Sequence, residues 1–180
     1  MTTYIALLRG INVSGQKLIK MAHLKTVIES LSFERVRTYI QSGNLLFESG
    51  ERDTDALSGL IQKKIKEVYG FDVPVAVRTA GELDAVISGC PFETEDLKEK
   101  GKLYVSFLST EPSAAATLKL LAFQSEVDDY RVQGRELYLL CRESYGKSLF
   151  SNNFVEKKLG VTATTRNWET VNKLAGLAKE

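Results

Sequence analysis

Short strand-like segments and helical patterns occur in the same order twice along the chain, and this repetition most constrains its fold. Apolar runs rich in β-branched and aromatic residues predict the strands, and apolar residues spaced three to four apart predict the helices. In the first half the strands are expected at 4–9, 36–40, 45–47 and 73–78, and the helices at 21–31 and 57–68. In the second half they are expected at 103–108, 127–132, 137–141 and 161–165, with helices at 114–123 and 150–159. Each half therefore has the order βαββαβ.

The most economical fold for this order is the split βαβ sandwich. We therefore expect an α+β protein made of two ferredoxin-like βαββαβ halves, with extra helices between them and at the C-terminus. The expected parts are a first half at 1–79, a helix and an acidic connection at 80–102, and a second half at 103–180. The hairpins YIQSGNLLF and YRVQGRELYLL resemble each other, which favours an internal duplication. Several strands are apolar on both faces, so the face without helices needs a second cover.

The handedness of the crossovers predicts where polar residues gather in the first half. Strand one ends at Arg9 and Asn12, and strand two turns into strand three at Gln41, Ser42 and Asn44. Right-handed crossovers place these ends at the same rim of the sheet. The five residues are therefore candidate ligand contacts. Turn chemistry with satisfied hydrogen bonds is the simpler alternative explanation for this stretch.

A similar argument predicts a polar rim in the second half. The stretch that contains Lys147 and Ser148 follows one strand and precedes a helix, and Arg166 and Asn167 end the last strand. Helix N-termini with neighbouring cations bind anions, so these four residues are further candidate ligand contacts. The sequence Gly146-Lys147-Ser148 ends like a P-loop, but Cys141 stands at the position of the first glycine. Helix capping is the alternative function for this segment.

The remaining candidates for chemistry are few. The chain has one histidine, His23, which lies in a helical pattern and is expected to be at the surface or half-buried. Its two cysteines, Cys90 and Cys141, indicate no disulfide framework, and Cys90 is expected to be a packed or idle thiol. Trp168 is expected to anchor the core rather than to stack on a base. The loop at 9–17 lacks the GxGxxG pattern and is expected to be a binding loop. No metal or cofactor is expected.

Charge and hydropathy limit the class of protein. The net charge is +1, which argues against strong non-specific binding of nucleic acid, and no apolar run approaches the length of a membrane helix. The charge is uneven, because residues 1–47 carry +4, residues 48–141 carry −6 and residues 142–180 carry +3. The start of the chain also lacks the pattern of a signal peptide. We therefore expect a cytoplasmic protein that does not bind membranes.

Four stretches carry a resemblance to a known family: LRGINVSG, RTYIQSGN, GKSLFSNNFVEKKLGV and TTRNWETVNKL. They resemble the bacterial family catalogued as domain of unknown function 1697, whose members typically read LRGINVGG, TYIQSGN and TRNW. Ser14 stands where this family often has glycine, and Gly89-Cys90-Pro91-Phe92 stands where Asn-Pro-Phe is common. The resemblance implies a cytoplasmic α/β protein with a ferredoxin-like first half, and it implies no activity, substrate or catalytic residue.

The sequence leads to one functional expectation and two alternatives. The leading expectation is a binding module for an anionic ligand: a nucleotide, a phosphorylated metabolite or RNA. An enzyme acting on a carboxylate or phosphate substrate is an alternative, although no acid–base pair stands out. A self-associating interaction protein, such as a homodimer that buries an apolar sheet face, is the other alternative.

Overall fold

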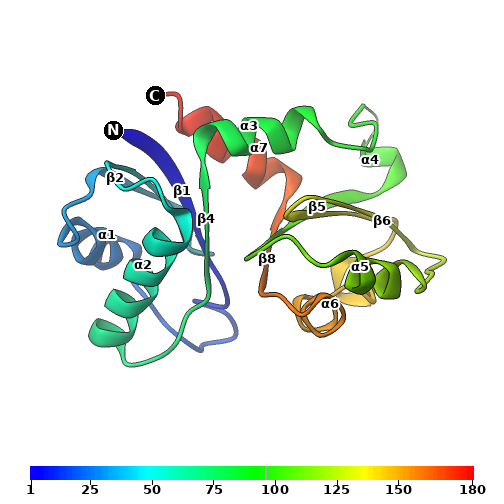
Figure 1. Cartoon of the computed structure of the whole chain (residues 1–180), viewed down its shortest axis with the longest axis horizontal. Coiled ribbons are helices and arrows are strands. Elements are labelled where there is room, and N and C mark those ends of the chain that lie inside the picture. The colour runs from blue at the N-terminus through cyan, green and yellow to red at the C-terminus, as the bar shows by residue number, and fades with distance from the viewer. Residues whose placement is uncertain (96) are drawn as a thin grey trace. The chain divides into compact units, whose positions relative to one another are not determined.

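The computed structural model describes residues 1–95 and 97–180 of the chain (Figure 1). The described part divides into two compact units. Unit 1 comprises Met1–Ala85 and Lys173–Glu180, and unit 2 comprises Val86–Asn172. The end of the chain thus belongs to the same unit as its beginning.

Unit 1 contains a four-stranded antiparallel sheet with the strand order β2-β3-β1-β4. Its elements in chain order are β1 (Thr2–Leu8), α1 (Met21–Glu29), β2 (Glu34–Tyr39), β3 (Asn44–Ser49), α2 (Thr54–Tyr69) and β4 (Val75–Thr79). The helix α3 (Ala80–Ser88) starts directly after β4. A capping box begins it, because the Thr79 hydroxyl accepts from the Glu82 amide at 3.0 Å and the Glu82 carboxylate accepts from the Thr79 amide at 2.8 Å.

Unit 2 contains a second four-stranded antiparallel sheet, with the order β6-β7-β5-β8. Its elements are α4 (Leu97–Lys100), β5 (Lys102–Leu108), α5 (Ala114–Leu121), β6 (Asp128–Gln133), β7 (Glu136–Cys141), the 3-10 turn η1 (Tyr145–Lys147), α6 (Asn152–Leu159) and β8 (Ala163–Asn167). The last helix, α7 (Trp168–Leu177), starts directly after β8. The predicted fold class, α+β with two βαββαβ halves and additional helices, is confirmed.

The residue pairings between strands correspond in the two sheets. In unit 1, Ile5 pairs with Leu46 on one side and with Arg78 on the other. In unit 2, Val105 takes the place of Ile5 and pairs with Tyr138 and Arg166. The bonds at the strand ends repeat as well: Leu8 donates to Gly43 O at 2.8 Å, and Leu108 donates to Arg135 O at 2.8 Å. This agreement, position by position, supports the predicted internal duplication.

Both faces of each sheet are buried. The helix-covered face of unit 1 packs Leu45 and Phe47 with Leu24 of α1 and Ile61 of α2. Figure 1 shows α1 and α2 side by side over this sheet. The corresponding face of unit 2 packs against α5 and α6 through the side chains Leu120, Val155 and Leu159. This burial of apolar area is the main stabilising term of each unit.

On the opposite face of each sheet, which α1, α2, α5 and α6 do not cover, residues such as Ile5 and Val105 have no exposed surface either. The ends of α3 and α7 supply part of the second cover. In unit 2 the Tyr138 hydroxyl donates to Val86 O of α3 at 2.7 Å, and in unit 1 the Arg37 guanidinium donates to Leu177 O of α7 at 2.6 Å. Within the described residues, no helix combines the length and the apolar character that a membrane span requires.

Candidate functional site

The predicted rim of unit 1 is assembled as the topology requires. The end of β1 is bonded to the turn before β3, and Arg9 N donates to Pro74 O at 3.0 Å just before β4. Asn12 Nδ2 donates to Gln41 O at 2.9 Å, which joins the two predicted polar stretches directly. The structure therefore brings Arg9, Asn12 and Gln41 to one rim.

Ser42 and Asn44 hold the turn itself. Asn44 is fully buried, and its amide donates to Tyr39 O at 2.8 Å and to the Ser42 hydroxyl at 3.1 Å. Gly43 has a φ of +95°, and a Cβ at this position would lie 2.8 Å from the Leu8 Cβ. These contacts agree with the alternative explanation of this stretch, in which it is a turn whose polar groups are hydrogen-bonded within the protein.

The predicted helix N-terminus at Lys147 and Ser148 is a different structure. Residues Tyr145–Lys147 form the 3-10 turn η1, and α6 begins only at Asn152, where the Ser151 hydroxyl accepts from Phe154 N at 3.3 Å. The expectation that Gly146–Ser148 starts a helix is therefore wrong. Ser151 caps the helical pattern that follows, and the Ser148 hydroxyl is bonded to Asp128 instead.

The side chains of Lys147 and Ser148 each contact a carboxylate. Ser148 Oγ donates to Asp128 Oδ2 at 2.9 Å, and Lys147 Nζ lies 3.2 Å from Glu143 Oε2. A ligand anion at Ser148 would lie close to the Asp128 carboxylate and would be repelled by it. This arrangement speaks against an anion at that serine.

Arg166 and Asn167 point to opposite faces of β8. Arg166 is only 8% exposed and donates to Thr165 O at 3.0 Å, and burial lowers the pKa of its guanidinium to about 10. Its equivalent in unit 1, Arg78, is also buried and donates to Val77 O. Both arginines lie in the interior of the fold. Asn167 is exposed, and its Oδ1 accepts from Thr170 N at 2.8 Å, which caps α7.

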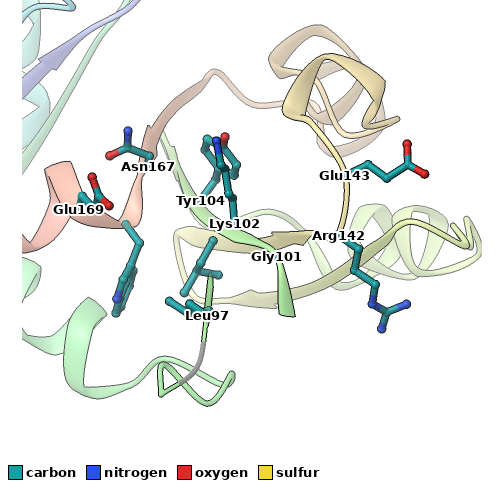
Figure 2. A pocket seen from close by; sticks show the side chains of 10 residues that line it. Leu97, Gly101, Lys102, Tyr104, Arg142, Glu143, Asn167 and Glu169 are labelled. Atoms are coloured by element: carbon teal, nitrogen blue, oxygen red, sulfur yellow. The ribbon is translucent and has the colours of Figure 1, made fainter. Parts of the chain in front are cut away.

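A pocket of about 500 Å³ lies at the rim of unit 2 where β5 begins and β7 and β8 end. Ten residues line it: Leu97, Gly101, Lys102, Leu103, Tyr104, Arg142, Glu143, Asn167, Trp168 and Glu169. Figure 2 shows Asn167 and Glu169 on one side, Arg142 and Glu143 on the opposite side, and Lys102 and Tyr104 between them. Of the predicted contacts in unit 2, only Asn167 belongs to this lining.

The pocket combines aromatic surface with cations. Tyr104 is half-buried and its ring packs 4.9 Å from that of Tyr145, and burial raises the pKa of the Tyr104 hydroxyl. Trp168, which the sequence predicted as a core anchor, is half-buried in the pocket wall. Lys102 is exposed and forms no ion pair within the described part of the chain.

The two carboxylates of the pocket differ in their surroundings. Glu143 is compensated by Lys147, and Glu169 lies in the first turn of α7. Arg142 donates to Glu126 O at 3.5 Å, which draws its guanidinium toward β6. The lining thus holds two cations, Lys102 and Arg142, and two carboxylates, Glu143 and Glu169, and Glu143 is also paired with Lys147 outside the lining.

Sequence reasoning missed Lys102, Tyr104 and Arg142. They lie at the rim that it identified, because β5 is antiparallel to β7 and β8 and so begins where those strands end. The signal for them lies in the topology, because the start of the central strand identifies this rim as well as the ends of its neighbours do. Gly101 marks this start, with a φ of +135° and room for no Cβ beside Cys141 O.

Other candidate groups are engaged in structural contacts. His23 is exposed on α1, as predicted, and its Nδ1 lies 2.7 Å from the Tyr69 hydroxyl. Burial raises the pKa of the Cys141 thiol to about 12, and the neighbouring Asp128 acts in the same direction. In the part of the chain that the structure describes, no three side chains among His, Cys, Asp and Glu are grouped to hold a metal ion.

Comparisons with known proteins agree with this fold. A solved structure described as the conserved bacterial protein SP0830 from Streptococcus pneumoniae is similar, with a TM-score of 0.77 and 22% identity over 98% of each chain. A search among curated proteins finds no match. The family model described as protein of unknown function (DUF1697) matches residues 1–138. The chain therefore belongs to the DUF1697 family.

Proposed function

We propose that this protein is a binding module whose pocket in unit 2 takes a small planar anion of the nucleoside monophosphate class. Its volume of about 500 Å³ supports this proposal, because small-molecule sites commonly span about 300–1,000 Å³. The observation that carries the proposal is the combination of Tyr104 and Trp168 with Lys102 in one lining. Aromatic rings bind planar groups, and a cation within the same pocket selects a negative charge.

Each polar group has a role in this proposal. Asn167 uses its Oδ1 for the helix cap, so its Nδ2 remains a donor for a base or a phosphate oxygen. Lys102 supplies the charge, and Glu169 disfavours a second negative group near the start of α7. The proposed ligand therefore carries its anion on the Lys102 side of the pocket.

Tryptophan fluorescence provides the test, because Trp168 is the only tryptophan of the chain. Titration with nucleoside monophosphates is expected to change its emission in a saturable way. Lys102→Ala is expected to weaken binding about tenfold, because a charge-assisted contact is lost. Glu169→Gln is expected to tighten binding about two- to threefold, because a repulsive carboxylate is removed.

The control is Lys119→Ala, which removes an exposed lysine on α5 of the same unit, outside the pocket. It is expected to leave the affinity unchanged. An emission that stays constant across the panel would refute the proposal. The opposite order of affinities, with Lys102→Ala binding more tightly and Glu169→Gln more weakly, would show that the pocket takes a cation instead.

A further inference from the structure

The loop after β1 in unit 1 has an unusual backbone. Positive φ values occur at Gly10, Asn12, Ser14, Gly15 and Lys17, and three of these five are not glycine. Gln16 N donates to Val13 O at 2.9 Å across two residues with positive φ, which is the geometry of a type I′ hairpin turn. Asn12 N donates to Lys17 O at 3.1 Å and closes the hairpin. The loop therefore has a defined shape.

Asn12 fixes this hairpin to the turn between β2 and β3. Its Nδ2 donates to Ile19 O at 3.0 Å and to Gln41 O at 2.9 Å, and its Oδ1 accepts from Ile19 N at 2.8 Å. Since one amide nitrogen bonds to both carbonyls, the chain near Leu18 lies beside the chain near Ile40. We call residues 9–20 together with 40–42 the loop surface.

The loop surface exposes large aliphatic side chains. Leu18 is 67% exposed, Val13 57% and Ile40 48%. Ile40 also has a φ of +49°, which a β-branched residue rarely adopts. Neither core packing nor backbone geometry favours isoleucine at this position. A strained and exposed aliphatic residue is better explained by contact with another molecule.

The same surface is basic. Arg9 and Lys17 line a hollow of about 530 Å³, together with Gly10, Val13, Ser14, Gln16 and Pro74. Lys20 is exposed just before α1, and no acidic residue precedes Glu29 in the chain. The nearby Asp72 carboxylate is paired with Lys66 at 3.4 Å, and Lys17 donates to the backbone oxygen of Asp72 at 2.6 Å.

We infer that the loop surface binds single-stranded nucleic acid. Its three cations suit phosphates, its aliphatic side chains suit the faces of unpaired bases, and the exposed amides of Gln16 and Gln41 suit base edges. A second copy of the chain on this surface would place cations against cations. An acidic peptide would satisfy the cations but would offer no planar faces to the exposed aliphatic side chains.

Fluorescence anisotropy with end-labelled 12-nucleotide single strands of RNA and of DNA tests this inference on the full chain. With three phosphate contacts, the slope of log affinity against log salt is expected to be about −2, and Lys17→Ala is expected to reduce it to about −1.4. Lys20→Ala is expected to reduce the slope by the same amount. Agreement between the two variants would show that the reduction does not come from misfolding of Lys17→Ala. A preference for one of the two polymers identifies the natural form.

The Ile40→Asn variant distinguishes an effect on binding from an effect on folding stability. Asparagine tolerates the positive φ, so the melting temperature is expected to rise by about 2–4 °C. The affinity for the strands is expected to fall about fivefold, because an aliphatic contact is lost. A structural role alone would move the two quantities in the same direction.

The matched control is Lys119→Ala in unit 2, which is expected to change neither the slope nor the affinity. The inference is overturned if neither strand binds at low salt, if binding is insensitive to salt, or if Ile40→Asn binds as tightly as the wild type. Equal binding of polyglutamate would assign the surface to an acidic protein. A dimer in sedimentation that Ile40→Asn abolishes would assign it to a second copy, and either result overturns the inference.

Discussion

The two units share their strand register and differ at their strand ends. At the rim where the central strand begins, unit 2 has Arg142, Trp168 and Glu169. The equivalent positions of unit 1, counted from the paired strands, hold Gly50, Ala80 and Gly81. Large side chains therefore line this rim in unit 2, whereas three of the equivalent positions in unit 1 hold small residues.

The central tyrosines show the same divergence. Tyr4 and Tyr104 occupy equivalent positions, but Tyr4 is 1% exposed and donates to Glu51 O at 2.6 Å, whereas Tyr104 is half-buried in the pocket lining. The opposite rim is elaborated in unit 1 instead. There, residues 9–20 connect β1 to α1, whereas residues 109–113 suffice between β5 and α5 in unit 2. The two units thus share one sheet topology and differ in which rim is elaborated.

The strongest test of the shared framework concerns the buried arginines. Arg78→Ala and Arg166→Ala are each expected to lower the free energy of unfolding by about 2–4 kcal/mol, because each leaves a cavity and unpaired polar groups. Urea unfolding of both variants measures the losses. A loss below about 1 kcal/mol for one of them would break the equivalence of the two sheets at this position.

The two hairpin turns are expected to respond unequally to alanine. A Cβ on Gly43 would lie 2.7 Å from Ile11 Cδ1, whereas one on Gly134 would meet only Glu136 Oε2, at 3.9 Å. Gly43→Ala should therefore cost about 2–3 kcal/mol, because overpacking adds to the strain of a positive φ. Gly134→Ala should cost about 1 kcal/mol from the positive φ alone. Equal losses in thermal unfolding would contradict this packing difference.

Trp168→Ala gives unit 2 the residue that unit 1 has at the equivalent position. Because it removes an aromatic wall, it is expected to weaken binding of nucleoside monophosphates about tenfold. Calorimetry measures this affinity, since the variant has no tryptophan left to report. An unchanged affinity would show that the ligand does not bind in this pocket.

The smallest expected effects concern the helix caps. Thr79→Ala and Asn167→Ala each remove a cap and should each cost about 1 kcal/mol of stability. Only Asn167→Ala is expected to weaken ligand binding as well, because Asn167 lines the proposed pocket and Thr79 does not. A loss of affinity in Thr79→Ala as well would show that the effect comes from stability.

Much of this fold could be predicted from the sequence. The order of strands and helices, the capping box at Thr79 and the helix cap at Asn167 follow from local pattern and turn chemistry, and the structure has them. The meeting of Asn12 with Gln41 followed from crossover handedness. These features depend on local pattern, on turn chemistry and on the handedness of the crossovers.

The site was harder to predict because it depends on which face of its strand each side chain lies on. Arg166 and Asn167 are neighbours in the sequence, yet one is buried and the other lines the pocket. Ser148 was expected to be a helix N-terminal donor, but Ser151 is the cap instead. The burial of a charged side chain, as for Arg78 and Arg166, has no counterpart in the hydropathy pattern that identifies core positions.

The claim that the pocket distinguishes the two units is tested most directly by NMR titration of the isotope-labelled full chain with adenosine monophosphate. Saturable shifts are expected for the backbone amides of Lys102, Arg142, Asn167 and Trp168. Their equivalents in unit 1, Thr2, Gly50, Thr79 and Ala80, should keep their positions. Shifts at both rims, or none at Lys102 and Trp168, would contradict the account.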